Sequence, residues 1–343
     1  MMISIKKADP FTPAFILSGG TLSVRPGLEV SVGSYVFNVS TYTPVALPTT
    51  MVAGTDYAVW ASPLGFEASP SFDSAPSMGA EIVGGFHYAP GGNATDVNTG
   101  GNATPQISPY SIWDLNFRPR CANARGMVLV ADSFWTDIYL LGVDHIVNGT
   151  SRNGVVIADG GEPPRRPLTC GGNGVAKAAL DWWMANEIMI SHGKKLLSYE
   201  EACTAFFGAR EGVPRGNDPV TTGLATTNTA SYAHDYMMTS KWGVIQATGC
   251  QWVWGRELGY SVGASPYDGS PRTPQIKPDF YAMSDSRGVL IQDTETATRG
   301  ALLGGKWNAS VGQPGSRCLD WADGVQLTSI SISARGRADH WIR

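Results

Sequence analysis

The chain has 343 residues and a formal net charge of −4, from 25 basic and 29 acidic side chains. This weakly acidic balance argues against a general binder of nucleic acid or of anionic membranes, and no apolar run approaches the roughly 20 residues that a membrane-spanning helix needs. The 41 glycines and 22 prolines predict many turns, while the 11 tryptophans indicate a substantial core or interface.

The first 116 residues have the pattern of an all-β domain. Short segments alternate apolar and polar residues and are separated by Gly and Pro, which is typical of a β-sandwich. These segments are 21–25, 28–32, 35–39, 56–60 and 81–88. We therefore predict a β-sandwich domain over residues 1–116, and we interpret residues 111–120 as the joint to a second domain.

The pattern changes after this joint. Residues 180–192 have helical periodicity that Gly193 ends, and Ser198 with Glu201 forms a capping box that begins a second helix. Two helices among short strands and many turns predict a compact α+β domain over residues 117–343. The expected strands of this domain include 240–246, 251–254 and 326–333.

The residues that could carry chemistry show no catalytic pattern. None of the five histidines lies beside a nucleophile motif such as Gly-x-Ser-x-Gly, and His192 is expected to cap the end of its helix rather than to act as a base. The cysteines have neither Cys-x-x-Cys nor zinc spacing, which favours buried free thiols in a reducing cytoplasm. They are Cys121, Cys170, Cys203, Cys250 and Cys318.

Cofactor and nucleic-acid sites are also weakly supported. Gly171 to Gly174 lacks the Gly-Lys-Ser/Thr ending of a phosphate-binding loop, so we expect an ordinary loop. Carboxylates such as Asp137 and Asp144 could offer oxygen ligands to calcium, but most such groups are solvated turns. The arginines between residues 118 and 166 form no run with interleaved aromatics. We therefore predict no cofactor and no nucleic-acid partner.

The last forty residues carry the most specific pattern. Glycine, tryptophan and arginine recur at its fixed points, from Gly304, Gly305 and Trp307 to Arg335 and Gly336, and small or polar residues fill the positions between them. A rigid frame that holds such residues suggests a display surface, because a catalytic pocket needs specific acids, bases or nucleophiles held in place.

Long stretches of the chain resemble the major tropism determinant family. The strongest are Val83-Gly-Gly-Phe-His-Tyr-Ala-Pro-Gly91, Phe134-Trp-Thr-Asp-Ile-Tyr-Leu-Leu-Gly-Val-Asp-His145, residues 239–250, Trp252-Val-Trp-Gly255 and Ala334-Arg-Gly336. The resemblance implies a receptor-binding protein of a phage tail fibre, made in the host cytoplasm, whose C-terminal domain has the C-type lectin-like fold variant of formylglycine-generating enzymes. It also implies a homotrimer that binds a bacterial surface receptor, protein or glycan.

In that family the C-terminal segment, here about 304–336, is the variable region of a diversity-generating retroelement, which rewrites chosen codons while the lectin-like fold holds the new side chains. Carried over by position, the variable residues would be Lys306, Asn308, Ala309, Ser310, Gln313, Asp320, Ala322, Asp323, Leu327, Ser329, Ser331 and Ile332. This chain carries one extra residue near Gly312 or Gln313, which shifts the register of positions 309–314.

The expected strand 326–333 fits this proposal at most positions. The two-residue period of a strand would place Leu327, Ser329 and Ser331 on one face, with Ile330 packed inward. Ile332 breaks this rule, and a strand end or a bulge would explain its exposure.

Two other functions stay open at this point. A formylglycine-generating enzyme would share the fold variant, but Cys318 has no second cysteine within a short span, as that chemistry requires. A fixed structural virion subunit would bind no receptor, and a template repeat with a reverse transcriptase beside the gene would argue against it. We also expect the chain to begin at the β-sandwich, without the N-terminal β-prism of the family's best-known member. Two alternatives then stay open: another protein supplies attachment to the virion, or the protein is cellular and derived from a prophage.

Overall fold

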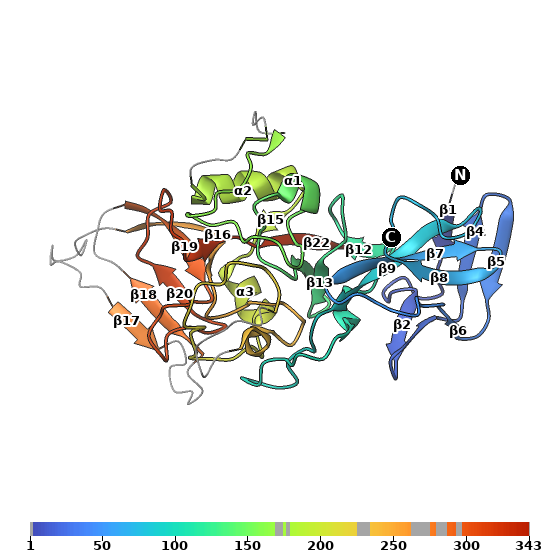
Figure 1. Ribbon diagram of the computed structural model, residues 1–343, viewed down its shortest axis with the longest axis horizontal. Coiled ribbons are helices and arrows are strands. Elements are labelled where there is room, and N and C mark those ends of the chain that lie inside the picture. The colour runs from blue at the N-terminus through green and yellow to red at the C-terminus, as the bar shows by residue number, and fades with distance from the viewer. Residues whose placement is uncertain are drawn as a thin grey trace.

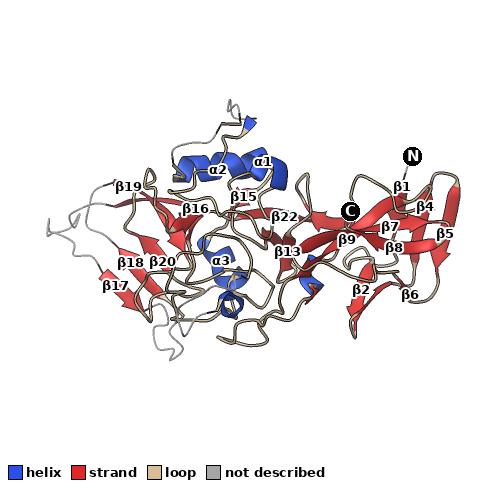
Figure 2. Ribbon diagram, in the orientation of Figure 1, coloured by secondary structure: helices blue, strands red, loops and turns tan. Residues whose placement is uncertain are grey.

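The computed structural model describes residues 3–168, 174–175, 179–224, 234–261, 275–278, 287–292 and 297–342. Within these residues the chain is mostly β, with several sheets and few helices (Figure 2). The molecule is elongated, with the first strands at one end and a six-stranded sheet at the other (Figure 1). None of the helices among the described residues is long and apolar enough to cross a membrane.

The N-terminal region is built from strands, as the alternation of its sequence predicts. The strands predicted at 21–25, 28–32, 35–39, 56–60 and 81–88 are all confirmed. Burial alternates along Leu28–Val32, whose apolar side chains enter a core that also holds Phe15, Tyr57 and Phe86. The strands are β1 Ile3–Lys6, β2 Phe15–Ser18, β3 Thr21–Val24, β4 Leu28–Val32, β5 Tyr35–Val39, β6 Thr43–Pro44, β7 Thr55–Ser62, β8 Gly65–Ser69 and β9 Glu81–Ala89.

A ten-stranded sheet continues from this region through residues 111–120 into the rest of the chain. Its main path runs β13-β14-β22-β12-β11-β9-β7-β8, with β10 beside β9 and β15 beside β22. The C-terminal strand β22 therefore lies between β12 and β14 in the middle of the sheet (Figure 1). The added strands are β10 Gln106–Ile107, β11 Trp113–Asp114, β12 Phe117–Pro119, β13 Met127–Val130, β14 Phe134–Asp137, β15 Lys195–Leu196 and β22 Gly336–Ile342.

Both predicted helices are confirmed. Helix α2, Trp182–Ser191, has Asp181 as its N-cap and His192 as its C-cap, as expected for that histidine. Helix α3, Tyr199–Ala205, begins at the predicted capping box of Ser198 and Glu201. The sequence did not predict helix α1, which is too short to show a helical period. Its bounds are His145–Asn148, and two 3-10 turns follow Ser108 and His234, η1 Pro109–Ser111 and η3 Asp235–Met238.

The six-stranded sheet has the order β17-β18-β20-β19-β16-β21. The strand predicted at 251–254 is confirmed as the start of β16, whereas the strand predicted at 240–246 is wrong. There the Ser240 hydroxyl accepts hydrogen bonds from the amides of Trp242 and Val244, and this local side-chain bonding favours a turn. The strands are β16 Trp252–Ser261, β17 Gln275–Pro278, β18 Val289–Gln292, β19 Ala297–Leu303, β20 Leu319–Trp321 and β21 Ile332–Ser333.

Candidate functional site

Two glycines turn the chain sharply where the candidate display segment begins. Gly304 and Gly305 have φ values of +86° and +88°, a left-handed conformation that favours glycine. A Cβ on Gly304 would lie 2.8 Å from the Ala247 carbonyl oxygen, and one on Gly305 would lie 2.7 Å from the Cα of Pro314. The sequence pattern of paired glycines therefore has a steric reason at both positions.

Backbone hydrogen bonds from other segments hold the loop that follows, residues 305–317. The Trp307 amide donates to the Cys250 carbonyl at 2.8 Å, and the Gly312 amide donates to the Gly212 carbonyl at 2.7 Å. The backbone is thus fixed at both ends of a short stretch, while Asn308 and Ser310 are exposed and Lys306, Ala309 and Gln313 are half-buried.

The buried carboxylate of Glu211 also holds the loop of residues 305–317 in place. Glu211 accepts hydrogen bonds from the amide of Ser316 at 2.8 Å and from its hydroxyl at 2.6 Å. The Arg287 guanidinium donates to the same hydroxyl from its Nη2 at 2.9 Å. The loop is therefore fixed by side chains that lie outside the candidate surface, and its own outward side chains are free to differ.

The second group of candidate residues lies on and after β20. Asp320 is buried, with 7% of its surface exposed, and its carboxylate accepts from the amide of Ala322 at 2.7 Å. Ala322 and Asp323 are half-buried, and their carbonyls accept from Arg299 and from the Gly300 amide. The structure therefore presents Ala322 and Asp323, whereas Asp320 works as part of the turn.

The third group of candidate residues, Leu327, Ser329, Ser331 and Ile332, lies mostly outside strands. The prediction of a strand over 326–333 is therefore wrong, because only Ile332 and Ser333 pair, in β21. The Ser329 carbonyl accepts from the Gly160 amide, and the Ile330 carbonyl accepts from the Gln251 side chain at 3.0 Å each. These partners belong to a loop and a side chain, so the two-residue period that a sheet imposes does not apply here.

The exposure of the two isoleucines in this group is the reverse of the prediction. Ile330, expected to pack inward, is 50% exposed, whereas Ile332, expected at the surface, is 1% exposed. Ile332 pairs with Trp252 in the parallel ladder of β21 and β16. Ser331 is also buried, and its hydroxyl lies 2.9 Å from that of Ser329. Of the candidate residues in this group, only Leu327 and Ser329 are partly exposed.

Strand pairing brings the first group, which lies within residues 306–313, and the third group to the same end of neighbouring strands in the six-stranded sheet. Leu303, the last residue of β19, pairs with both Val253 of β16 and Leu319 of β20. One position further along, Trp252 pairs with Ile332 at the start of β21. The loops before β20 and before β21 therefore lie at the same end of these strands. The hydrogen bond from the Gly300 amide to the Asp323 carbonyl holds the second group further along the sheet.

Sequence reasoning missed two exposed apolar side chains in this segment. Val311 is 75% exposed and Ile330 is 50% exposed. Both apolar side chains are therefore accessible to a partner, although other parts of the chain also expose apolar residues. The only signal in the sequence was the position of Val311 between Ser310 and Gly312, where a turn favours exposure.

The cysteine thiols near this segment are buried, whereas a nucleophilic thiol needs an accessible site that stabilises the thiolate. Cys250 and Cys318 are buried and form no disulfide. Burial raises the pKa of the Cys250 thiol well above its ordinary value, whereas a reactive cysteine needs a lowered pKa. Cys121 and Cys203 are half-buried, and Cys170 and the first glycines of the 171–174 loop lie outside the described residues. Among the described residues, no three His, Cys, Asp or Glu side chains gather as metal ligands would.

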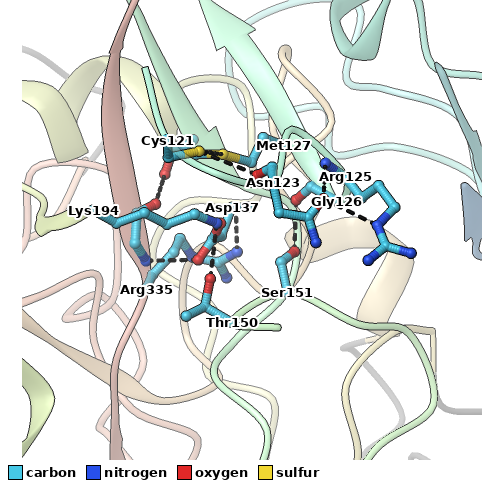
Figure 3. A network of polar contacts seen from close by, with 12 residues as sticks. Cys121, Asn123, Arg125, Gly126, Met127, Asp137, Thr150, Ser151, Lys194 and Arg335 are labelled. Atoms are coloured by element: carbon cyan, nitrogen blue, oxygen red, sulfur yellow. Dashed lines mark hydrogen bonds and ion pairs between the residues drawn. The ribbon is translucent and has the colours of Figure 1, made fainter. Parts of the chain in front are cut away.

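A buried polar network fixes the end of the segment (Figure 3). The Arg335 guanidinium is fully buried and donates to the carbonyls of Asp137, Ile138 and Ile245 at 2.7–2.8 Å. The Asp137 carboxylate accepts from the Gly336 amide at 2.9 Å and from Lys194 Nζ at 2.5 Å. Burial lowers the pKa of Arg335 to about 10. The arginine and the glycine that the sequence marked as fixed points are therefore structural.

Two histidines beside this network share a hydrogen bond. His145 Nε2 lies 2.7 Å from the Arg165 carbonyl oxygen, and His145 Nδ1 lies 2.9 Å from His192 Nε2. Because a carbonyl only accepts, Nε2 of His145 carries a hydrogen, and in the neutral ring Nδ1 of His145 accepts from Nε2 of His192. Burial lowers the pKa of His145, and burial together with the neighbouring His145 and Lys194 lowers that of His192 to about 4.

We predict that acid destabilises the protein through this pair. Between pH 6.5, the ordinary histidine pKa, and about pH 4, the unfolded chain binds protons that folded His192 does not. The stability is therefore complete above pH 6.5 and is lost as the pH falls toward 4. His192→Gln keeps a donor for His145 and removes one titration, so its melting temperature should fall less steeply over this range. Equal slopes in thermal denaturation of the two proteins would contradict the prediction.

Comparisons with known proteins agree with one another. A family model described as the Mtd second domain matches residues 16–114. The tail fiber receptor-binding protein of Bordetella phage BPP-1 is 40% identical, in an alignment that covers 98% of this chain and 84% of that protein. Solved structures of the U1 and M1 variants of Major Tropism Determinant are each 38% identical, with a TM-score of 0.85, and each match covers 99% of this chain and 86% of theirs.

Proposed function

The chain belongs to the major tropism determinant family, and on this premise we propose that residues 304–336 form its receptor-binding surface. The family is one of phage tail fibre receptor-binding proteins and is not enzymatic, so the chain is a virion component and the alternative of a formylglycine-generating enzyme is set aside. The partner that follows from this function is a receptor on the bacterial host.

Nine of the twelve candidate residues are offered to such a partner. Asp320, Ser331 and Ile332 are buried, so we assign them to the frame. We propose that direct contacts come from the remaining nine together with the exposed Val311 and Ile330. The nine are Lys306, Asn308, Ala309, Ser310, Gln313, Ala322, Asp323, Leu327 and Ser329. The observation that carries this proposal is the contrast between a backbone fixed from outside the segment and side chains that are not buried, of which only Leu327 packs against the core.

The finer fold assignment is part of the same proposal. We propose a β-sandwich over residues 1–116 and a C-type lectin-like domain over residues 117–343. The hydrophobic core of the first region, which includes Val30, Val59 and Val83, is distinct from the cores around Phe206 and Trp254, and this supports the division. The continuous ten-stranded sheet makes the joint stiff, so the display surface would keep a fixed direction relative to the first domain.

We further propose that the protein is a homotrimer, on the strength of the family resemblance. The contact residues include no Trp, Tyr or Arg, which are the side chains that most often dominate binding energy, so single-site affinity should be modest. Three copies that face one way would raise the effective affinity through avidity. Equal binding of monomeric and trimeric protein to host cells would contradict this part of the proposal.

The receptor-binding surface can be tested by adding bulk to it. We expect Ser310→Trp and Ala322→Trp to reduce adsorption to host cells by about tenfold or more, because each would break shape complementarity at a contact. Leu64→Trp is the matched control, since Leu64 is 92% exposed in the turn between β7 and β8 at the other end of the molecule. Adsorption unchanged in all three variants, with normal circular dichroism, would mean that the receptor binds elsewhere.

The variability of the surface has its own test. Sequencing codons 300–343 from a population of the source phage or host should give substitutions at these nine positions that trace to adenines in a nearby template. A homogeneous segment would instead indicate a receptor-binding protein of fixed specificity.

A further inference from the structure

A polar hollow of about 290 Å³ lies between the first domain and the loops that follow residues 121 and 146. Asp56 of β7, Asn123, Arg125, Asn148, Arg152 and Lys194 are among the residues that line it. Figure 3 shows five of the lining residues, Asn123, Arg125, Thr150, Ser151 and Lys194, all of which come from loops and turns. None of its lining residues comes from the 304–336 segment, so the hollow is separate from the proposed receptor-binding surface.

Two arginines in the lining have guanidinium N–H groups that make no hydrogen bond within the part of the chain that the structure describes. Arg152 is exposed, and its side chain makes no hydrogen bond or ion pair among the described residues. Arg125 uses its Nε to donate to the Asn123 side chain at 3.0 Å and rests on the ring of Phe72 at 4.9 Å. Its terminal amino nitrogens donate to no group in the part of the chain that the structure describes, so both arginines can offer planar, paired donors to a ligand.

A buried cation lies among the same lining residues. Only 5% of the Lys194 side chain is exposed, and its Nζ donates to Asp137 and to the Thr150 hydroxyl at 2.8 Å. Asp137 Oδ1 lies 2.5 Å from Lys194 Nζ, and this buried ion pair offsets the charge of Lys194. The two arginines are thus the cations of the hollow that are free to bind a ligand.

The one acidic residue among those that line the hollow, Asp56, already makes hydrogen bonds within the protein. Asp56 Oδ1 lies 2.9 Å from His87 Nδ1 and accepts from the Gly126 amide at 3.0 Å. His87 in turn lies 2.9 Å from the Tyr139 hydroxyl, so this carboxylate belongs to a buried chain that joins β7 and β9 to the residue stretch after β14. A ligand in the hollow therefore meets a net positive lining.

We propose that this hollow binds a small oxyanion, the phosphate or the carboxylate of a compact ligand such as a single sugar acid. Arginine forks match both groups in geometry, and the amide side chains of Asn123 and Asn148 can donate to the remaining oxygens or accept from neighbouring hydroxyls. The volume is near the lower end of the range for small-molecule sites, which admits a single phosphate or one monosaccharide unit.

The test is calorimetric titration of the full-length protein at low ionic strength with sodium phosphate, with sodium glucuronate and with neutral glucose. We expect saturable binding of at least one anion and none of glucose. Stronger binding of phosphate would indicate a phosphorylated ligand, and stronger binding of glucuronate would indicate a sugar acid. Arg125→Gln and Arg152→Gln should each weaken the binding about tenfold, because each removes charged hydrogen bonds.

The matched control is Arg166→Gln, because Arg166 is exposed on a neighbouring loop but does not line the hollow. Its affinity should equal that of the unmodified protein. Binding of neither anion, full affinity in the double variant of Arg125 and Arg152, or an equal loss in Arg166→Gln would each overturn the proposal. Host-cell adsorption of the same variants reports on the receptor-binding surface, so failure of one proposal can be told from failure of the other.

Discussion

Replacing Arg335 with alanine should lower the free energy of unfolding by about 3–5 kcal/mol, the size expected when a buried hydrogen-bonded charge is removed. Its guanidinium is fully buried and holds two carbonyls of the 137–138 turn and those of Ile245 and Gln246. Without it, these acceptors would stay buried and unpaired. Urea denaturation followed by tryptophan fluorescence measures the loss directly.

Two further variants make this result specific. Arg335→Lys keeps the charge, but one ammonium cannot reach both pairs of carbonyls, so we expect an intermediate loss. Arg210→Ala removes an exposed arginine that donates to the Asn98 carbonyl at 3.0 Å, and it should change stability by no more than about 0.5 kcal/mol. A loss below about 1 kcal/mol for Arg335→Ala would mean that relaxation or water satisfies the carbonyls.

Asparagine at position 332 should destabilise the protein by about 3 kcal/mol or more, whereas asparagine at position 330 should cost about 0.5 kcal/mol or less. The two positions carry the same residue type two places apart. Ile332 is packed in the core with Trp252 and Trp254, and a side-chain amide there would lose apolar contacts and find no ready partner. Ile330 is half-exposed, so its replacement stays solvated.

This pair of variants tests how far the proposed display segment can vary. If the structure is correct, Ile332→Asn will melt at a clearly lower temperature while Ile330→Asn will melt like the unmodified protein, and natural variation at 332 will be limited to apolar residues. The reverse order of stabilities would restore the assignment that sequence position alone suggests. In host-cell adsorption, Ile330→Asn should act as a surface variant, with reduced binding and an intact fold.

Local features of this chain could be predicted from the sequence because their causes are local. The capping box of Ser198 and Glu201 involves residues three apart, and the stop at Gly193 needs only a positive φ at that glycine. The N-terminal strands follow from an alternation that a half-buried sheet imposes on each segment separately. The family resemblance, and with it the receptor-binding function, came from long motifs such as residues 134–145, most of which are buried.

The tertiary structure alone decided which side chains of the candidate segment face outward. Residues 326–331 alternate like a strand, but the Gly160 amide and the Gln251 side chain bond the carbonyls of Ser329 and Ile330, so the two-residue period of a sheet does not apply at these two positions. In the same way, Asp320 appears suited to the surface by composition, yet strand pairing with Leu302 buries it. The sequence of residues 111–120 predicts a joint between two domains, and the structure shows that these residues also supply two strands of the ten-stranded sheet.

The physical reason for this division is the range of the interactions. Caps, turns and alternation depend on neighbours within a few residues, and those neighbours are printed in the sequence. The exposure of a loop residue depends on partners such as Gly160 or Gln251, which lie 169 and 79 positions from the residues that they hold, Ser329 and Ile330. The sequence by itself therefore determined the family, helices α2 and α3 and the first strands, and it pointed to a candidate display segment. The assembled sheet decided which side chains of that segment face outward.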